Sequence, residues 1–159
     1  MKKHNIVVLA LVAIIFVVVF LPTLLSWISA RKDFDNNFTH FTKGNISSID
    51  VSQDFRSPTI FTVTDKSNCD AFFDAIKRQE PYTPNHPKYN QKMSFSITLR
   101  KGDPIQIIVS TMEGRDFAYC DYVRSTGTHT SYFGTFKSKE LYRWLINNKV
   151  TEQVAASDR

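Results

Sequence analysis

The chain has 159 residues, and its 20 Lys and Arg against 15 Asp and Glu give a formal net charge of +5. Lys2 and Lys3 precede an apolar segment, so residues 31–159 carry 18 basic and 15 acidic side chains, a net charge of +3. This small excess, without a dense Lys and Arg stripe interleaved with aromatic residues, argues against a nucleic acid partner. About 110 residues follow the apolar segment, enough for one domain and too few for two.

Residues 6–28 form the apolar segment, and it contains no polar side chain from Ile6 to Leu21. At about 1.5 Å per helical residue, this length reaches the roughly 30 Å of a bilayer's hydrocarbon core. A cleaved secretory signal ending near Ala30 is the alternative, but its apolar core would be only about 7 to 15 residues. We therefore expect residues 1–30 to be a short stub and a single transmembrane signal anchor.

The distribution of positive charge predicts the orientation of this anchor. Lys2 and Lys3 lie before it, whereas Arg31 and Lys32 after it are diluted by nearby acidic residues. Basic residues favour the cytoplasmic side, so the N-terminus is expected in the cytoplasm. The sequence thus predicts a single-pass protein, in a membrane such as the bacterial inner membrane, with an extracytoplasmic, periplasmic C-terminal domain and membrane lipid as one partner.

Residues 31–45 are expected to be a helical juxtamembrane linker. Phe34, Phe38 and Phe41 follow one another at spacings of four and three, which places them in one stripe on a helix. One interpretation is that the membrane helix continues and packs this stripe on the domain core. The other is an interfacial or partner-binding helix, and Gly44 would end either one.

The domain proper is expected over residues 46–150. Two short strands are predicted at 46–51 and 59–64, and the second is rich in β-branched residues. A helix follows, with Ser67 as its cap and Asp70 as the reciprocal partner in a capping box. Pro81 ends this helix.

The stretch "QEPYTPNHPKYNQK", residues 79–92, contains three of the chain's six prolines. Each proline fixes its own φ and biases the preceding residue toward extended backbone, so exposed side chains here lose little entropy on binding. We therefore expect Tyr82, His86 and Tyr89 to be contact residues for a partner. The alternative is a stiff loop that folds back over the edge of the sheet and protects it.

A period-two pattern then predicts a meander of four strands, at residues 93–99, 105–111, 117–123 and 129–136. A last helix starts at Ser138, and the polar tail 151–159 is expected to fray. The order β-β-α-β-β-β-β-α predicts an α+β domain of two layers, an antiparallel sheet with its helices on one face.

The strand at 117–123 has one face toward the core and one face toward solvent. Asp121 is not expected to face the core, so Cys120 and Tyr122 do, and Phe117 and Tyr119 face outward. These outward rings form a second candidate binding surface, although one face of an antiparallel sheet is ordinarily wet.

The two cysteines, Cys69 and Cys120, permit one disulfide in an oxidising compartment, since the helix carrying Cys69 should pack over the face of Cys120. Two buried free thiols are the alternative.

Motifs for chemistry are absent from the sequence: it has no His-Glu-x-x-His, no Cys-x-x-Cys and no Gly-x-Ser-x-Gly. No metal site and no cofactor are predicted. The sequence therefore favours a non-enzymatic binding module whose partner is another protein, either an inhibitor or immunity-type protein or an accessory subunit of an envelope complex. The alternatives are a ligand-sensing domain that signals through a membrane partner, and an enzyme of unrecognised type that uses His86, His129 or Asp121.

Overall fold

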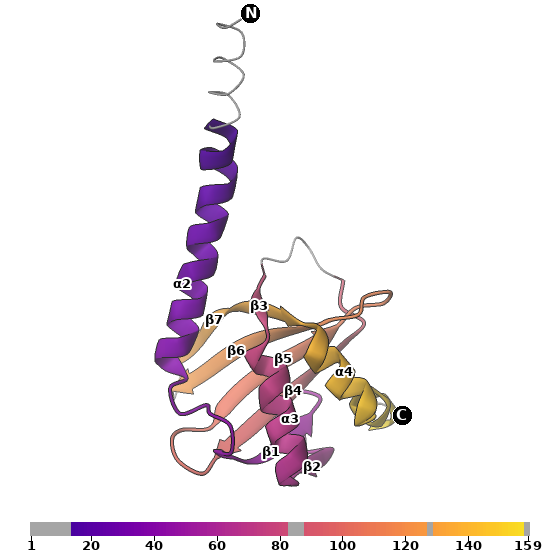
Figure 1. Ribbon diagram of the computed structural model, residues 1–159. Coiled ribbons are helices and arrows are strands. Elements are labelled where there is room, and N and C mark those ends of the chain that lie inside the picture. Colours follow the sequence, from indigo (N-terminus) through magenta and orange to yellow (C-terminus); the bar gives the residue numbers. More distant parts are fainter. Residues whose placement is uncertain (1–13, 83–87, 127–128, 158–159) are drawn as a thin grey trace, which may run out of the picture.

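The computed structural model describes residues 14–82, 88–126 and 129–157, and it has an α+β fold with a seven-stranded antiparallel sheet (Figure 1). The strands are β1 (Ile46–Ser52), β2 (Phe61–Val63), β3 (Glu80–Pro81), β4 (Gln91–Leu99), β5 (Ile105–Thr111), β6 (Ala118–Thr126) and β7 (His129–Ser138). The helices are η1 (Phe16–Phe20), α2 (Leu21–Asn37), α3 (Lys66–Lys77), α4 (Lys139–Asn147) and α5 (Val150–Ser157).

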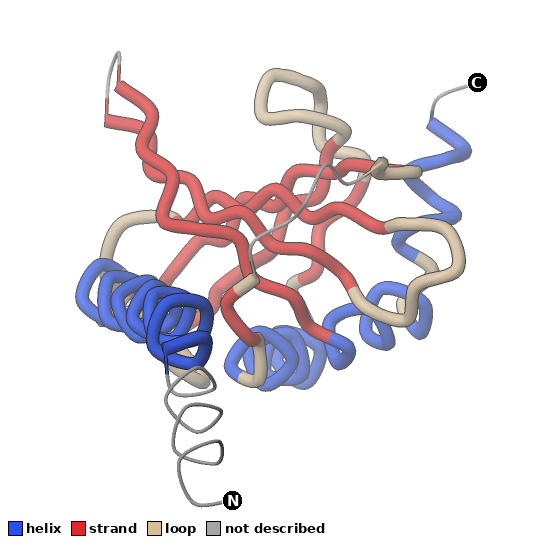
Figure 2. The backbone as a smooth tube through the Cα atoms, turned by 90° about the horizontal axis from the view of Figure 1, so that it is seen from above, coloured by secondary structure: helices blue, strands red, loops and turns tan. Residues whose placement is uncertain are grey.

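The strands follow the spatial order β2-β1-β4-β5-β6-β7-β3, so the predicted meander forms the centre of the sheet. Seen from above, the helices lie along one side of the sheet (Figure 2). Alternate residues face these helices, and one row across the sheet contains Val51, Phe95, Ile107 and Tyr122 in register. All four side chains are fully buried, which is the period-two pattern expected of a sheet with one covered face.

The N-terminal helix projects from this domain (Figure 1). Its π-helical turn η1 ends shortly before Pro22, and such a turn is one way in which a helix accommodates a residue without an amide hydrogen. Nine large apolar residues here are each 42% to 66% exposed: Ile14, Ile15, Val17, Val18, Phe20, Leu21, Leu24, Leu25 and Ile28.

Within the described ranges, no helix combines the length and the apolar character needed to cross a membrane. Residues 6–13 of the predicted span lie outside those ranges.

The C-terminal end of α2 belongs to the domain core. Phe34 is only 7% exposed, and its ring lies 4.6 Å from that of Tyr122 and 5.5 Å from that of Phe136. Phe38 packs partly against the core, and Phe41 is buried with its ring 5.2 Å from Phe73. The three rings therefore pack on the domain, as the first interpretation predicted, but α2 ends at Asn37 rather than at Gly44, so Phe38 and Phe41 follow the helix.

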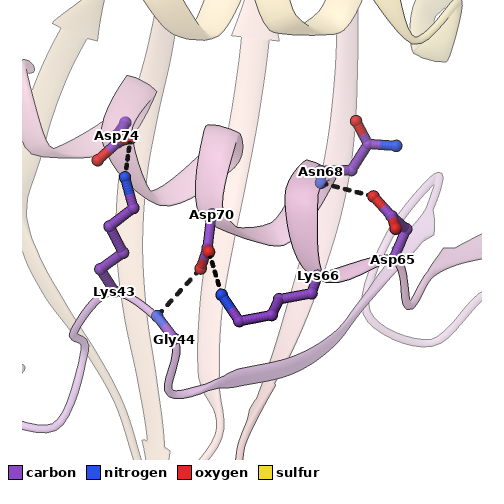
Figure 3. A network of polar contacts seen from close by, with 7 residues as sticks. All are labelled: Lys43, Gly44, Asp65, Lys66, Asn68, Asp70 and Asp74. Carbon is purple, nitrogen blue, oxygen red and sulfur yellow. Dashed lines mark hydrogen bonds and ion pairs between the residues drawn. The ribbon is translucent and has the colours of Figure 1, made fainter.

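A polar network at the start of α3 replaces the predicted capping box (Figure 3). Asp65, not Ser67, is the N-cap residue, and its carboxylate accepts a hydrogen bond from the Asn68 amide at 2.9 Å. Asp70 instead accepts hydrogen bonds from the Gly44 amide and from Lys66, at 3.1 and 2.5 Å. The predicted cap was two residues too late, because Ser and Asp are both good caps and the sequence has both within three residues, at Asp65 and Ser67.

Two elements are absent from the predicted order. The tail was expected to fray, yet residues 150–157 form α5, because Val150 and Val154 are buried against the core. The proline-rich stretch begins with the short strand β3, which pairs with β7 through Glu80 and Lys137 and through Pro81 and Phe136. Ser138 caps α4 as predicted, accepting a hydrogen bond from the Leu141 amide at 3.0 Å.

The burial of Phe34 predicts the effect of its removal. The substitution Phe34→Ala should lower the free energy of unfolding by about 3 to 5 kcal/mol, since it empties a site between two buried rings. Urea titration of the full chain in detergent micelles measures this. Leu25→Ala is the matched control, because Leu25 is 56% exposed on the same helix. Equal losses in both variants would contradict the assigned packing.

Candidate functional site

The two candidate surfaces of the sequence, the proline-rich stretch and the outward face of β6, come together in one aromatic cluster. We use this name for Tyr82, Tyr89, Phe117 and Tyr119. The Tyr119 ring lies 5.2 Å from Tyr82, 5.5 Å from Tyr89 and 5.2 Å from Phe117. The Tyr82 and Phe117 rings lie 6.4 Å apart. Three of these four contacts are edge-on, a favoured geometry for aromatic pairs, and the Tyr82–Tyr119 contact is tilted.

The strands on both sides of the stretch position its tyrosines. Tyr82 follows β3 directly, and its amide donates a hydrogen bond to the Thr135 carbonyl on β7 at 2.8 Å. Tyr89 precedes β4, and the next residue, Asn90, donates its amide to the Thr111 carbonyl at 2.9 Å. The stretch therefore starts at the β7 edge and ends beside β5, and its two tyrosines pack onto the open face, which is the face opposite the helices.

The cluster buries what would otherwise be a wet surface. Tyr119 is 2% exposed and Ser110, its neighbour in register on β5, is fully buried, although both are on the open face. Tyr82 and Tyr89 of the proline-rich stretch thus fold back onto the sheet, which is close to the alternative interpretation of residues 79–92 as a protective loop. Residues 83–87, with His86, lie outside the described part of the chain.

Two lysines complete the cluster. The Lys92 ammonium lies 5.0 Å from the centre of the Tyr89 ring, and Lys137 lies 5.5 Å from Tyr82 and 5.9 Å from Phe117. All three distances fall within the range of cation–π attraction. The register places these lysines in one row with Ser110 and Tyr119, and Glu80 on β3 extends that row beyond Lys137.

Burial changes the acid–base chemistry of the cluster. It raises the pKa of Tyr119 to about 12, with further contributions from a hydrogen bond to Tyr82 and from the neighbouring phenols. Burial also raises the pKa of Tyr89. The Ser110 hydroxyl is buried without a hydrogen-bond partner among the described residues. Tyr89 and Tyr119 therefore keep their phenol protons at ordinary pH, and the cluster presents apolar rings with hydroxyl groups.

Asp121 lies in the next row of the open face, opposite Ile108 on β5 and Thr135 on β7. Burial raises the pKa of its carboxyl group, while the Thr135 hydroxyl, which donates a hydrogen bond at 2.5 Å, and the Lys92 charge lower it. The balance is a pKa above the ordinary aspartate value.

A charged pocket of about 320 Å³ opens beside Phe117 and Lys137. Each of its three acidic groups has a partner within the domain: Glu80 pairs with Lys137 at 3.5 Å, Asp116 with Lys139 at 2.9 Å, and Glu140 with Arg143 at 3.9 Å. The Lys139 ammonium also lowers the pKa of Asp116. Arg78 lines the same pocket, and its side chain has no hydrogen bond or ion pair to any other described residue.

The described residues offer little for covalent or metal chemistry. No group of three His, Cys, Asp or Glu side chains within residues 14–82, 88–126 and 129–157 is arranged to hold a metal ion. The register places His129 opposite Thr126, at the hairpin end, and Asp121 opposite Thr135, so these two candidates for an enzyme site are apart. Burial raises the pKa of the Cys120 thiol, the opposite of what activates a nucleophile.

Sequence reasoning singled out all four rings and placed Phe117 and Tyr119 on the open face, but it did not predict that Tyr82 and Tyr89 pack there, and it missed the two lysines and the pocket. The alternation of residues could have placed Lys92 on the open face, because it lies two positions before Ser94 on the same strand. Nothing in the sequence indicates that Lys137 reaches Tyr82, because that contact depends on the pairing of β3 with β7.

Of the two alternatives for the cysteines, the structure has the second: both thiols are buried and free. The Cys69 thiol donates a hydrogen bond to the Val63 carbonyl on β2 at 3.8 Å, whereas Cys120 is on β6. β2 and β6 are four strand spacings apart, about 19 Å. Because Cys69 on α3 lies against β2, it is too far from Cys120 for a disulfide, which requires Cα atoms within about 7 Å. The sequence correctly placed both residues on the same face of the sheet but not at the same end.

No known protein family matches this chain, and no characterised protein or solved structure is significantly similar to it. The geometry of the cluster and of α2 is therefore the basis for a functional proposal.

The burial of both thiols predicts their reactivity. In the folded protein neither should react with a maleimide reagent, since Cys69 is 1% exposed, Cys120 is fully buried and burial raises the pKa of both thiols. After denaturation without a reductant, two maleimides should add per chain, as measured by mass spectrometry. A denatured chain that takes up none would demonstrate a disulfide and overturn the assigned positions.

The raised pKa of Asp121 predicts a pH dependence of stability. A carboxyl group whose folded pKa exceeds its unfolded pKa binds protons more readily in the folded state, so its contribution falls as pH rises between the two values. Asp121→Asn, which keeps the acceptor for Thr135, should therefore exceed the native protein in stability at pH 7. The advantage should shrink as pH falls through the folded pKa of Asp121.

Urea titrations at a series of pH values measure this effect. Asp50→Asn is the matched control, because Asp50 accepts a hydrogen bond from the Thr62 hydroxyl at 2.6 Å in the same Asp–Thr arrangement at the exposed side of the sheet. A stabilisation by Asp121→Asn that is independent of pH, or no larger than the control, would contradict the burial argument.

Proposed function

We propose that this chain is a membrane-anchored, extracytoplasmic and non-enzymatic binding module, either of inhibitor or immunity type or an accessory subunit of an envelope complex. The observation that carries the proposal is the exposed apolar surface from Ile14 to Ile28, which leads directly into a helix end buried in the domain. Apolar surface in water costs roughly 25 cal/mol per Å². A bilayer around residues 6–28 removes that cost.

The partner surface that we propose is the charged pocket together with the adjoining Phe117 ring. Its acids are already paired, so Arg78 is left as a cation available to a partner. Aromatic rings beside an arginine are the groups that most often contribute strongly to protein interfaces. An acidic side chain of a partner protein would satisfy the guanidinium group while an apolar neighbour covers the ring.

A sensing function remains the second candidate, favoured by the path from α2 to the cluster. Phe34 contacts Tyr122 on the helix-covered face of β6, and Tyr119, three residues earlier on the same strand, belongs to the cluster. Occupancy of the cluster would therefore act on the strand that α2 packs against. A ligand that alters the packing of α2 on β6 would distinguish a sensing domain from a passive binding module.

The predicted topology has a direct test. A phosphatase that is active only outside the cytoplasm, fused after Arg159, should be active in cells, and the full chain should remain in the membrane after extraction with alkaline carbonate. An inactive phosphatase in a stable fusion would place the domain in the cytoplasm and refute the proposal.

The partner surface is tested by two substitutions and a control. Arg78→Glu reverses an exposed charge in the pocket, and Phe117→Ala removes the ring; Arg100→Glu makes the same charge reversal at an exposed site outside the pocket. Tagged full-length chains are purified from solubilised membranes, and the retained proteins are quantified by mass spectrometry.

We expect at least one protein to be retained by the native chain and by Arg100→Glu, and reduced about tenfold or more by Arg78→Glu, since a hot-spot arginine contributes about 1.4 kcal/mol or more. Thermal unfolding of each variant establishes that the domain still folds. An identical set of retained proteins for all variants would exclude this surface.

A further inference from the structure

The junction between α2 and the domain leaves little room between the domain and a membrane. The last exposed apolar residue of α2 is Ile28, and the first buried one is Phe34. Six helical residues correspond to a rise of about 9 Å. Because Phe34 packs against two rings of the sheet, the domain is fixed to the helix rather than tethered by a flexible linker.

The order of the strands determines which edge of the sheet is closest to that boundary. Phe34 contacts Tyr122 on β6 and Phe136 on β7, and β3 lies beside β7 at this edge of the sheet. β2 forms the opposite edge, six strand spacings or about 29 Å away. Figure 1 shows β3 next to α2 on the side of its N-terminal part, and β2 at the far end of the domain.

The side chains at the near end have the chemistry of a membrane interface. Tyr82 follows β3, Tyr89 precedes β4, and both are only partly buried. Lys88 and Lys92 are exposed beside them, with Lys92 over the Tyr89 ring. Tyrosine is enriched at the headgroup level of bilayers, where its ring is apolar and its hydroxyl group is wet. Lysines extend their ammonium groups toward anionic headgroups.

We propose that the tyrosine side of the aromatic cluster rests on the lipid headgroup layer of the same membrane that holds α2, so that the domain lies with β3 near the bilayer and β2 away from it. This inference rests on the proposed membrane anchor and identifies lipid as the partner of Tyr82, Tyr89 and Lys88. The charged pocket beside Phe117 then meets protein partners that are themselves close to the membrane surface.

A protein strand fits this edge less well than lipid does. β3 has two residues, and one of them is Pro81, which has no amide hydrogen to pair with an added strand. Arg31 follows the exposed apolar surface of α2 within one turn and is followed by the exposed Lys32. Cationic groups on α2 and beside the cluster therefore meet the same headgroup layer, where basic residues are attracted to anionic lipids.

Three spin-labelled variants of the full chain test this arrangement. Val18→Cys is on the exposed apolar part of the helix, Lys88→Cys is beside the cluster, and Thr64→Cys is exposed directly after β2. The native cysteines are buried and do not compete for the label. Each variant is reconstituted into vesicles of phosphatidylcholine and phosphatidylglycerol. Collision rates are then measured with oxygen, which partitions into lipid, and with a water-soluble nickel chelate.

The label at Val18 should collide mainly with oxygen and the label at Thr64 mainly with nickel. At Lys88 the nickel rate should be several-fold lower than at Thr64, and the oxygen rate should correspond to headgroup depth. A nickel rate at Lys88 equal to that at Thr64, with Val18 in lipid, overturns the inference and leaves the anchor intact. A label at Lys88 shielded from both reagents indicates contact with a second copy and also overturns it. An aqueous label at Val18 refutes the anchor itself.

Discussion

The packing of Phe34 against Tyr122 and Phe136 is the contact that joins the two halves of this protein. It lies where the exposed apolar helix ends and the sheet begins, and it is made of three buried rings at edge-on angles. A packed aromatic core has few alternative arrangements, so a domain held in this way keeps one orientation to its helix. The position of every other surface relative to α2 follows from this contact.

The open face of the sheet depends on a second, independent contact. Tyr82 after β3 and Tyr89 before β4 pack over Tyr119, and Lys92 and Lys137 lie in the same row as Tyr119. This covers a face that an antiparallel sheet ordinarily exposes, and it leaves the Ser110 hydroxyl and much of Asp121 away from water.

The sequence predicts an element well when local residues form it and poorly when packing against distant residues forms it. The meander and the Ser138 cap were predictable because alternation and capping are local properties. β1 reads weakly in the sequence, yet it pairs with strands on both sides, because its partners rather than its own residues make it a strand. The tail residues 151–157 read as polar, and α5 forms because Val150 and Val154 find a buried site. The two cysteines lie on the same face of the sheet, but Cys69 is next to β2 and Cys120 is on β6.

The apolar N-terminal segment, the α+β class and the face of β6 on which Phe117 and Tyr119 lie could all be read from the residues alone. They follow from composition and periodicity, which act over a few residues. The joining of the two candidate surfaces in one cluster, the position of Lys137 over Tyr82 and the separation of the thiols appear only in the folded chain. Those facts depend on the order β2-β1-β4-β5-β6-β7-β3, which results from packing between residues far apart in the chain.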